Sequence, residues 1–209
     1  MADGGAGRDG FDAVLLAGGL AKRLEGADKP ALSLGGVTLL DRVVEACAAA
    51  RDVVCVGPVR PTRRPVRWTR EDPPGSGPAA ALAAGLRLTR GPYVVVLAAD
   101  LPFLTADVIH TLWTNAAGHD GAVLTDHEGR DQWLAACYRH SSLTDAITRY
   151  DSTAGLSLRR LLAGFDLARV PDVDGRAFDC DTWEDVAHVR RLVDGGGGDH
   201  RPPGAESEH

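Results

Sequence analysis

The chain has 209 residues, of which 44% are apolar and 5% aromatic, and its 23 Lys and Arg against 29 Asp and Glu give a formal net charge of −6. This size suits one domain with its own core, while the surplus of acid argues against nucleic-acid or anionic-membrane partners, which need a basic surface. The longest apolar runs, such as Tyr93 to Ala99, are too short to cross a bilayer, and the N-terminus is polar and glycine-rich. We therefore expect a cytoplasmic protein.

Both ends of the chain have a composition typical of disorder. Residues 1–10 and 195–209 are rich in Gly and polar residues, and such segments bury too little apolar surface to offset the loss of chain entropy. We therefore predict two disordered tails and one domain over residues 11–194.

Short apolar runs alternate with helical patterns along this domain. We predict strands at Ala13–Leu16, Asp52–Val56, Tyr93–Ala98, Ala122–Thr125, Leu134–Tyr138 and Asp166–Val170. We predict helices at Leu39–Ala50, Pro78–Leu88, Thr105–Asn115, Ser142–Arg149, Leu156–Leu162 and Thr182–Val193. Thr105 and Thr182 suit N-caps, the second in a relative of the capping box completed by Asp185. The alternation predicts an α/β domain with a mostly parallel central sheet and helices on both faces.

Four cysteines, Cys47, Cys55, Cys137 and Cys180, are widely spaced and include no CxxC pair. Because a free cysteine packs as a small apolar residue, we expect reduced thiols in the core. A disulfide or a metal site is the less favoured alternative.

The loop after the first predicted strand has the composition of a phosphate-binding loop. In open α/β sheets, ligands bind beyond the carboxyl ends of the strands. Here Gly18 and Gly19 would let backbone amides approach a phosphate, and Arg23 and Lys29 would neutralise its charge. The segment matches neither the P-loop nor the dinucleotide fingerprint. The alternative is an ordinary glycine turn with solvated charges.

Asp100 follows the strand at Tyr93–Ala98 directly and is a candidate ligand for Mg²⁺, which needs only one or two protein carboxylates beside phosphate and water oxygens. The alternative role is to cap the turn before the next helix. Asp179 and Asp181 alternate in an extended segment, so their side chains would lie on the same side of it, and one of them could join Asp100 as a metal ligand.

The loop Glu71–Pro78, which includes Asp72 and Gly77, is a candidate nucleoside site because it offers backbone donors and small residues to a nucleobase or ribose. The alternative is that it only connects a strand to a helix.

Four segments taken together are similar to the molybdenum cofactor guanylyltransferase family. They are LAGGLAKRLEGADKP, EDPPGSGPAAALAAGL, LAADLPFL and DCDTWEDV, in this order over residues 11–193. The opening motif of that family is approximately LAGGxxxRMGGxDK, and its positions are matched here by Gly18, Gly19, Arg23, Gly26, Asp28 and Lys29.

This resemblance implies a Rossmann-like nucleotidyltransferase domain that transfers GMP from GTP to molybdopterin with Mg²⁺ and releases pyrophosphate. It implies that Leu16, Ala17, Gly18 and Gly19 hold the nucleotide, Lys29 the phosphates, Asp72 and Gly77 the nucleoside region, and Asp100 the magnesium ion, with Asp181 as a second candidate ligand. Arg23, Lys29 and Asp100 would be the catalytic residues. The implied partners are GTP or another NTP, a molybdopterin-type acceptor and, transiently, molybdoenzymes.

The chain departs from the family pattern in places that bear on the base and the acceptor. Leu24-Glu25 replaces the Met-Gly pair, Ala81 replaces a glycine, and no Asn follows the strand that ends at Val56. The acidic segment Asp179 to Thr182 resembles cytidylyltransferases of related type. The alternatives are therefore a cytidylyltransferase, an enzyme for another phosphorylated acceptor, and a non-catalytic nucleotide-binding relative.

The expected reaction is an in-line attack by an acceptor phosphate on the α-phosphorus of the NTP. Because that oxygen is already anionic, the reaction needs no Ser, Cys or His nucleophile, and no catalytic triad is evident in the sequence. Positioning and charge neutralisation would supply the catalysis.

Overall fold

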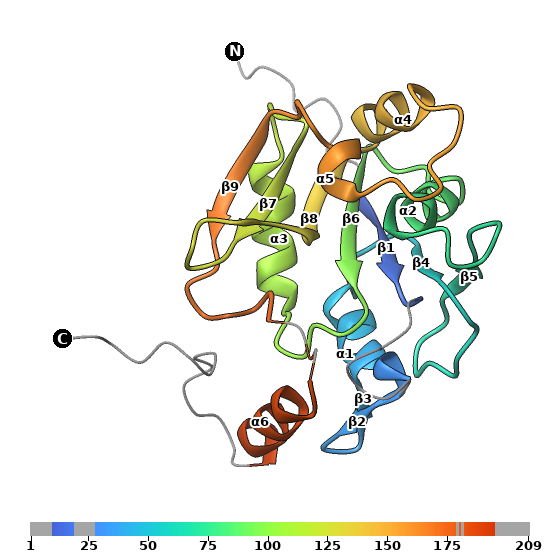
Figure 1. Cartoon of the computed structure of the whole chain (residues 1–209). Coiled ribbons are helices and arrows are strands. Elements are labelled where there is room, and N and C mark those ends of the chain that lie inside the picture. The colour runs from blue at the N-terminus through green and yellow to red at the C-terminus, as the bar shows by residue number, and fades with distance from the viewer. Residues whose placement is uncertain (1–9, 19–27, 179, 181, 195–209) are drawn as a thin grey trace.

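The computed structural model describes residues 10–18, 28–178, 180 and 182–194 (Figure 1). Its centre is a seven-stranded sheet with the order β5-β4-β1-β6-β8-β7-β9. The strands are β1 (Phe11–Leu16), β4 (Val53–Val56), β5 (Arg67–Thr69), β6 (Tyr93–Ala98), β7 (Gly121–Thr125), β8 (Asp131–Arg139) and β9 (Leu167–Pro171). Within this sheet only β8 runs against its neighbours. The expected α/β domain with a mostly parallel sheet is confirmed.

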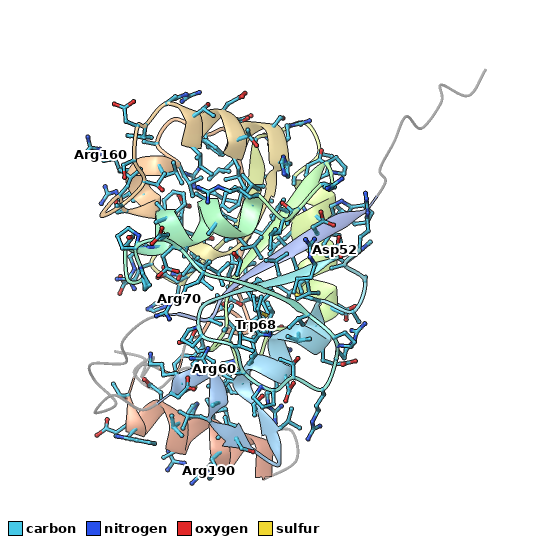
Figure 2. The ribbon with its side chains drawn as sticks, turned by 90° about the vertical axis from the view of Figure 1, so that its right-hand side faces the viewer. Asp52, Arg60, Trp68, Arg70, Arg160 and Arg190 are labelled. Atoms are coloured by element: carbon cyan, nitrogen blue, oxygen red, sulfur yellow. The ribbon has the colours of Figure 1, made fainter. Side chains whose placement is uncertain are left out.

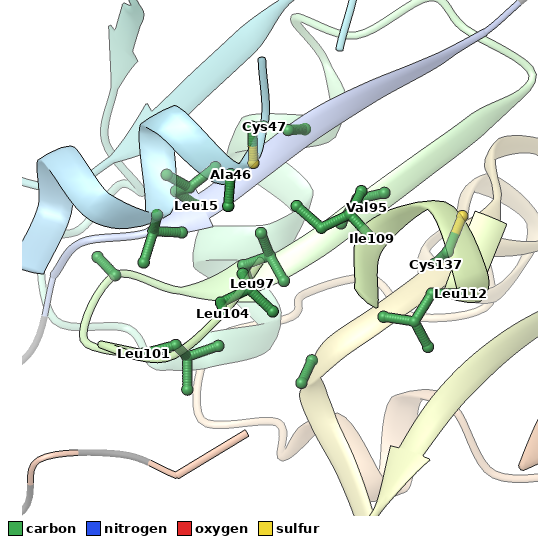
Figure 3. Close-up of a cluster of buried hydrophobic side chains, with 14 of the residues drawn as sticks. Leu15, Ala46, Cys47, Val95, Leu97, Leu101, Leu104, Ile109, Leu112 and Cys137 are labelled. Atoms are coloured by element: carbon green, nitrogen blue, oxygen red, sulfur yellow. The ribbon is translucent and has the colours of Figure 1, made fainter. Parts of the chain in front are cut away.

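Helices cover both faces of the sheet (Figure 1). On one face, α1 (Leu39–Ala46) and α3 (Ala106–Asn115) pack on alternate strand residues such as Leu15 and Leu97. Figure 3 shows this cluster, in which Ile109 and Leu112 of α3 approach the strands. The other face carries α2 (Pro78–Leu86), α4 (His140–Thr148) and α5 (Leu158–Leu161). The period-two alternation of each strand thus divides the core into two layers.

The packing of α2 explains its small residues. Every residue from Ala79 to Leu86 is buried. A Cβ atom at Gly85 would lie 2.5 Å from Cγ1 of Val14 and 2.9 Å from Cγ2 of Val56, so only glycine lets the helix approach β1 and β4 this closely. This contact places the first turn of α2 at the carboxyl end of the parallel strands.

A smaller apolar cluster lies beyond that end of the sheet. It joins the hairpin of β2 (Ser33–Leu34) and β3 (Val37–Thr38) to α6 (Trp183–Asp194). The expected cap of α6 is present: Thr182 Oγ1 accepts the amide of Asp185, and the Asp185 carboxylate accepts the amide of Thr182. The Thr105 cap of α3 is confirmed as well.

Some predicted boundaries were wrong. The first helix ends at Ala46 rather than at Ala50, because residues from Cys47 onward form turns before β4. The edge strand β5, the β2–β3 hairpin and the 3-10 helix η2 (Lys29–Ala31) were missed; each is two or three residues long and too short to show a period. Both predicted tails, apart from Gly10, lie outside the described residues. All four cysteines are buried thiols, as expected.

Candidate active site

The first candidate loop and Asp100 leave the sheet side by side. Leu16 is the register partner of Ala98 in β6 and of Val56 in β4. The amide of Ala17 donates to the carbonyl of Val56 at 2.8 Å, and the amide of Ala99 donates to the carbonyl of Leu16 at 3.2 Å. The pairing therefore continues to the last residue before each loop.

Lys29 and Asp100 meet at this edge. Nζ of Lys29 lies 3.5 Å from Oδ2 of Asp100, and the two side chains are 14% and 19% exposed. Because this ion pair still reaches solvent, a ligand can bind to it: Lys29 can bind a phosphate and Asp100 a cation, in place of part of their contact with each other. The structure thus brings together two of the residues that the sequence selected from segments far apart.

The start of η2 holds Lys29 in place. The amide of Ala31 donates to the carbonyl of Asp28 at 3.0 Å, and that of Leu32 donates to the carbonyl of Lys29 at 3.0 Å. Pro30 favours this tight turn because its φ angle is fixed and its missing amide is not needed there.

Arg60 is a site residue that the sequence analysis missed. Its guanidinium binds the carboxylate of Asp28 through Nε at 2.9 and 2.8 Å and through Nη2 at 2.6 Å. Its Nη1 donates to the carbonyl oxygens of Ala17 at 2.8 Å and Pro58 at 2.9 Å. In the sequence Arg60 is one of several arginines between residues 60 and 70, and nothing there distinguishes it.

Gly57 packs closely against the Ala17–Gly18 peptide. Its φ angle is +146°, and a Cβ atom there would lie 2.7 Å from the carbonyl carbon of Ala17 and 2.8 Å from the amide nitrogen of Gly18. Only glycine fits this approach.

The loop before α2 is the third predicted segment of the site. Asp72 is exposed, and Gly77, with a φ angle of +97°, immediately precedes the helix. The Glu71 carboxylate accepts the amide of Gly75 at 2.8 Å, and the carbonyl of Ser76 accepts the amide of Gly155 at 2.8 Å. Because β5 is parallel to β4, this loop lies at the same sheet edge, but no contact between Asp72 and Lys29 or Asp100 is seen among the described residues.

A cavity of about 1200 Å³ opens at the ends of β7 and β9 and the start of β8. These ends lie on the same edge as Asp100, because β7 and β9 run in the direction of β6 while β8 runs against it. Its lining includes the half-buried aromatic rings of Trp133 and Phe178 and the guanidinium of Arg159 in α5. The sequence analysis had not identified this cavity, since its residues come from three separate segments.

The carboxylates of the cavity are bound within the protein. Asp126 accepts hydrogen bonds from Arg130 and Gln132, and Asp131 pairs with Arg169 at 2.9 Å. Burial opposes ionisation of Asp126, but the hydrogen bonds from Arg130 hold its pKa below the ordinary value. By contrast, Arg159 has no ion pair within the described part of the chain.

The remaining predicted residues are outside the structure's description. Gly19, Arg23, Asp179 and Asp181 belong to residues 19–27, 179 and 181, so their predicted roles are untested. Within the described ranges no group of three or more His, Cys, Asp or Glu forms a metal cluster. Among the described residues, the carboxylate of Asp100 has the chemistry that suits Mg²⁺, which needs only one or two protein carboxylates when phosphates and water complete its shell. No described helix is long and apolar enough to span a membrane.

Known sequences match this chain over most of its length. The model of the MobA-like NTP transferase domain matches residues 13–170. A probable molybdenum cofactor guanylyltransferase of Mycobacterium tuberculosis H37Rv is 35% identical over 175 residues, covering 78% of this chain and 84% of that protein. One from Natronomonas pharaonis is 30% identical over 196 residues, covering 86% and 96%.

Solved structures agree on the fold. Molybdopterin-guanine dinucleotide biosynthesis protein A from Archaeoglobus fulgidus superposes with a TM-score of 0.69 at 21% identity, over 88% of this chain and 100% of its own. The 2-C-methyl-D-erythritol 4-phosphate cytidylyltransferase from Thermus thermophilus reaches 0.67 at 20% identity, over 88% and 99%. These likenesses show a nucleotidyltransferase fold shared by chains with different substrates.

Proposed function

The chain belongs to the MobA-like NTP transferase family, and on this premise we propose that it transfers GMP from GTP to molybdopterin, the organic part of the molybdenum cofactor, with release of pyrophosphate. The Lys29–Asp100 pair carries this proposal. The pair lies at the carboxyl edge of the sheet, where ligands bind in open α/β folds. Its charged atoms are 3.5 Å apart and both side chains are partly exposed, so a cationic and an anionic group are available to one ligand.

The proposed role of the first loop is to hold the triphosphate. Gly18 presents its backbone without a side chain, and Lys29 offsets the negative charge that accumulates as pyrophosphate leaves. Asp100 is the residue that would hold Mg²⁺, which would neutralise phosphate oxygens. Arg23 and Asp181 keep their proposed roles as phosphate and metal ligands.

The nucleoside is proposed to lie over the loop before α2. Gly77 leaves the start of the helix open because it has no side chain, and Asp72 is exposed earlier in the same loop. The exposed carboxylate would accept hydrogen bonds from ribose hydroxyls or from the base.

The acceptor is proposed to occupy the cavity at the ends of β7, β8 and β9. Molybdopterin pairs a planar ring system with a terminal phosphate, and the cavity offers aromatic rings in Trp133 and Phe178 and a cation in Arg159. The attacking phosphate oxygen is anionic, so the residues of the chain need only orient it in line with the bond that breaks.

The proposal is tested by measuring pyrophosphate release from GTP with purified molybdopterin and Mg²⁺. CTP and ATP replace GTP in parallel reactions, and a sugar 1-phosphate replaces molybdopterin. Release only with another NTP or acceptor would assign the chain a different nucleotidyl transfer. Nucleotide binding without release under every combination would indicate a non-catalytic relative. A cytoplasmic location and transfer of the product to molybdoenzymes are part of the proposal and need separate localisation and pull-down experiments.

A further inference from the structure

We propose that Arg60 is a positioning residue that acts through Asp28 to hold Lys29 against Asp100. The inference rests on the proposed function, since it assigns Arg60 a part in the same phosphate site. It starts from a geometric fact: one guanidinium contacts both the residue before Gly18 and the residue before Lys29.

The side chain of Arg60 is only 12% exposed, and all three nitrogens of its guanidinium have partners. Nε and Nη2 bind the Asp28 carboxylate, while Nη1 donates to the carbonyl oxygens of Ala17 and Pro58. A guanidinium makes such a bridge because its donors diverge in one plane; an amide or ammonium group cannot reach all three acceptors at once.

The contacts join the two ends of the first loop. Ala17 ends the path of β1, and Asp28 begins the turn that carries Lys29. By binding both, Arg60 fixes the position of Asp28 relative to Ala17. In Figure 2, Arg60 lies between the strands of the central sheet above and α6 below.

The effect of Arg60 reaches the reacting groups through one residue. The carbonyl of Asp28 accepts the amide of Ala31, so the placement of Asp28 sets the position of η2 and of the Lys29 side chain. Nζ of Lys29 is 3.5 Å from Asp100, and a displacement of about 1 Å at such a position can cost on the order of 100-fold in rate. Gly57, three residues before Arg60, also packs closely against the Ala17–Gly18 peptide.

The test compares R60Q with the matched control R63Q. Arg63 lies in the same segment, donates to the carbonyl of Gly36 and is 3.9 Å from Asp41, so its side chain has partners other than Ala17 and Asp28. We expect R60Q to lower kcat for pyrophosphate release about 10- to 100-fold, with a Tm within a few degrees of wild type, and R63Q to keep wild-type kcat. A merely structural role would instead lower Tm and leave the kcat of the folded fraction unchanged.

The double variant D28N/R60Q tests whether Arg60 acts through Asp28. If it does, D28N and R60Q each lower kcat, and the double variant is no slower than the more impaired single variant. Effects of the two substitutions that multiply fully would overturn the proposal, as would wild-type kcat in R60Q.

Chemical labelling of Lys29 supplies a readout that does not depend on turnover. The side chain of Lys29 is 14% exposed and lies 3.5 Å from Asp100, so we expect its amine to react slowly with an acetylating reagent in the wild type. We expect Lys29 to be acetylated several-fold faster in R60Q than in wild type or R63Q, as measured by mass spectrometry of its peptide, because a looser local structure exposes the amine more often. Equal labelling of Lys29 in all three proteins would contradict the proposal. If the wild type releases no pyrophosphate from any NTP, the proposed function fails, and this arm still decides the role of Arg60.

Discussion

The Nζ atom of Lys29 lies 3.5 Å from Oδ2 of Asp100, although the two residues come from different loops at the carboxyl edge of the sheet. Lys29 follows the loop after β1, and Asp100 directly follows Ala99, whose amide is still bonded to Leu16 of β1. The parallel pairing of β1 with β6 places Asp100 near the end of β1, and the turn that follows Asp28 carries Lys29.

Replacing either member of this pair should remove most of the turnover. We expect Lys29→Ala and Asp100→Ala each to lower kcat about 100-fold or more, because each removes a preorganised charge from the phosphate site. Fixed-time assays of pyrophosphate release at saturating NTP measure the change in kcat, and the Tm of each variant checks that it is folded. An Asp100→Ala protein that keeps most of its Mg²⁺-dependent turnover would show that Asp100 does not hold the metal.

Arg159 should affect the acceptor and not the nucleotide. We expect Arg159→Gln to raise KM for the acceptor about 10-fold, the effect of losing one charge-assisted hydrogen bond, while KM for the NTP stays unchanged. Arg160→Gln is the matched control, since Arg160 is the next residue of α5 and does not line the cavity. Equal effects of both substitutions would place the acceptor elsewhere.

Gly85→Ala should destabilise the protein although alanine favours helices. The new methyl group would meet Cγ1 of Val14 at 2.5 Å, and overpacking of this kind costs about 1–3 kcal/mol in the free energy of unfolding. Urea unfolding measures the loss. In Val14→Ala/Gly85→Ala the added methyl regains space, so the double variant should lose less than the sum of the two single losses; strict additivity would argue against this contact.

The thiols should be unreactive in the folded protein. Burial raises the pKa of Cys55 to about 12 and raises the pKa values of Cys47 and Cys137 as well. Since the thiolate is the reactive form, we expect these three thiols to show no reaction with a disulfide reagent at pH 8 until urea unfolds the chain. Rapid modification of any of them in the native state would contradict their burial.

Asp120 should contribute to acid sensitivity. A hydrogen bond from Ser142, together with one from the backbone of Asp166, lowers its pKa from the ordinary 3.8. A lowered pKa stabilises the fold above the ordinary pKa, and the contribution disappears as pH falls through the lower, folded-state value. Ser142→Ala should thus reduce the free energy of unfolding at pH 6, and its difference from wild type should shrink below pH 3.8; a constant difference would exclude this linkage.

The sequence predicted most of the sheet because its central strands are unbroken apolar runs; the bounds of β6 at Tyr93–Ala98 match the prediction residue for residue. It also selected Lys29 and Asp100, because glycine and charge at strand ends favour ligand binding, and the structure places these two residues 3.5 Å apart. It could not identify Arg60, whose role comes from a turn that returns it to Asp28. Nor could it identify the cavity around Arg159, which depends on how β8 runs against β7.

The decisive measurement is pyrophosphate release by the purified wild type with molybdopterin and Mg²⁺, with GTP, CTP or ATP offered singly at equal concentration. We expect release from GTP to require the acceptor and to exceed release from CTP and ATP. We expect it to fall about 100-fold in Lys29→Ala. Release from CTP in preference to GTP, or wild-type release in Lys29→Ala, would contradict the proposed function.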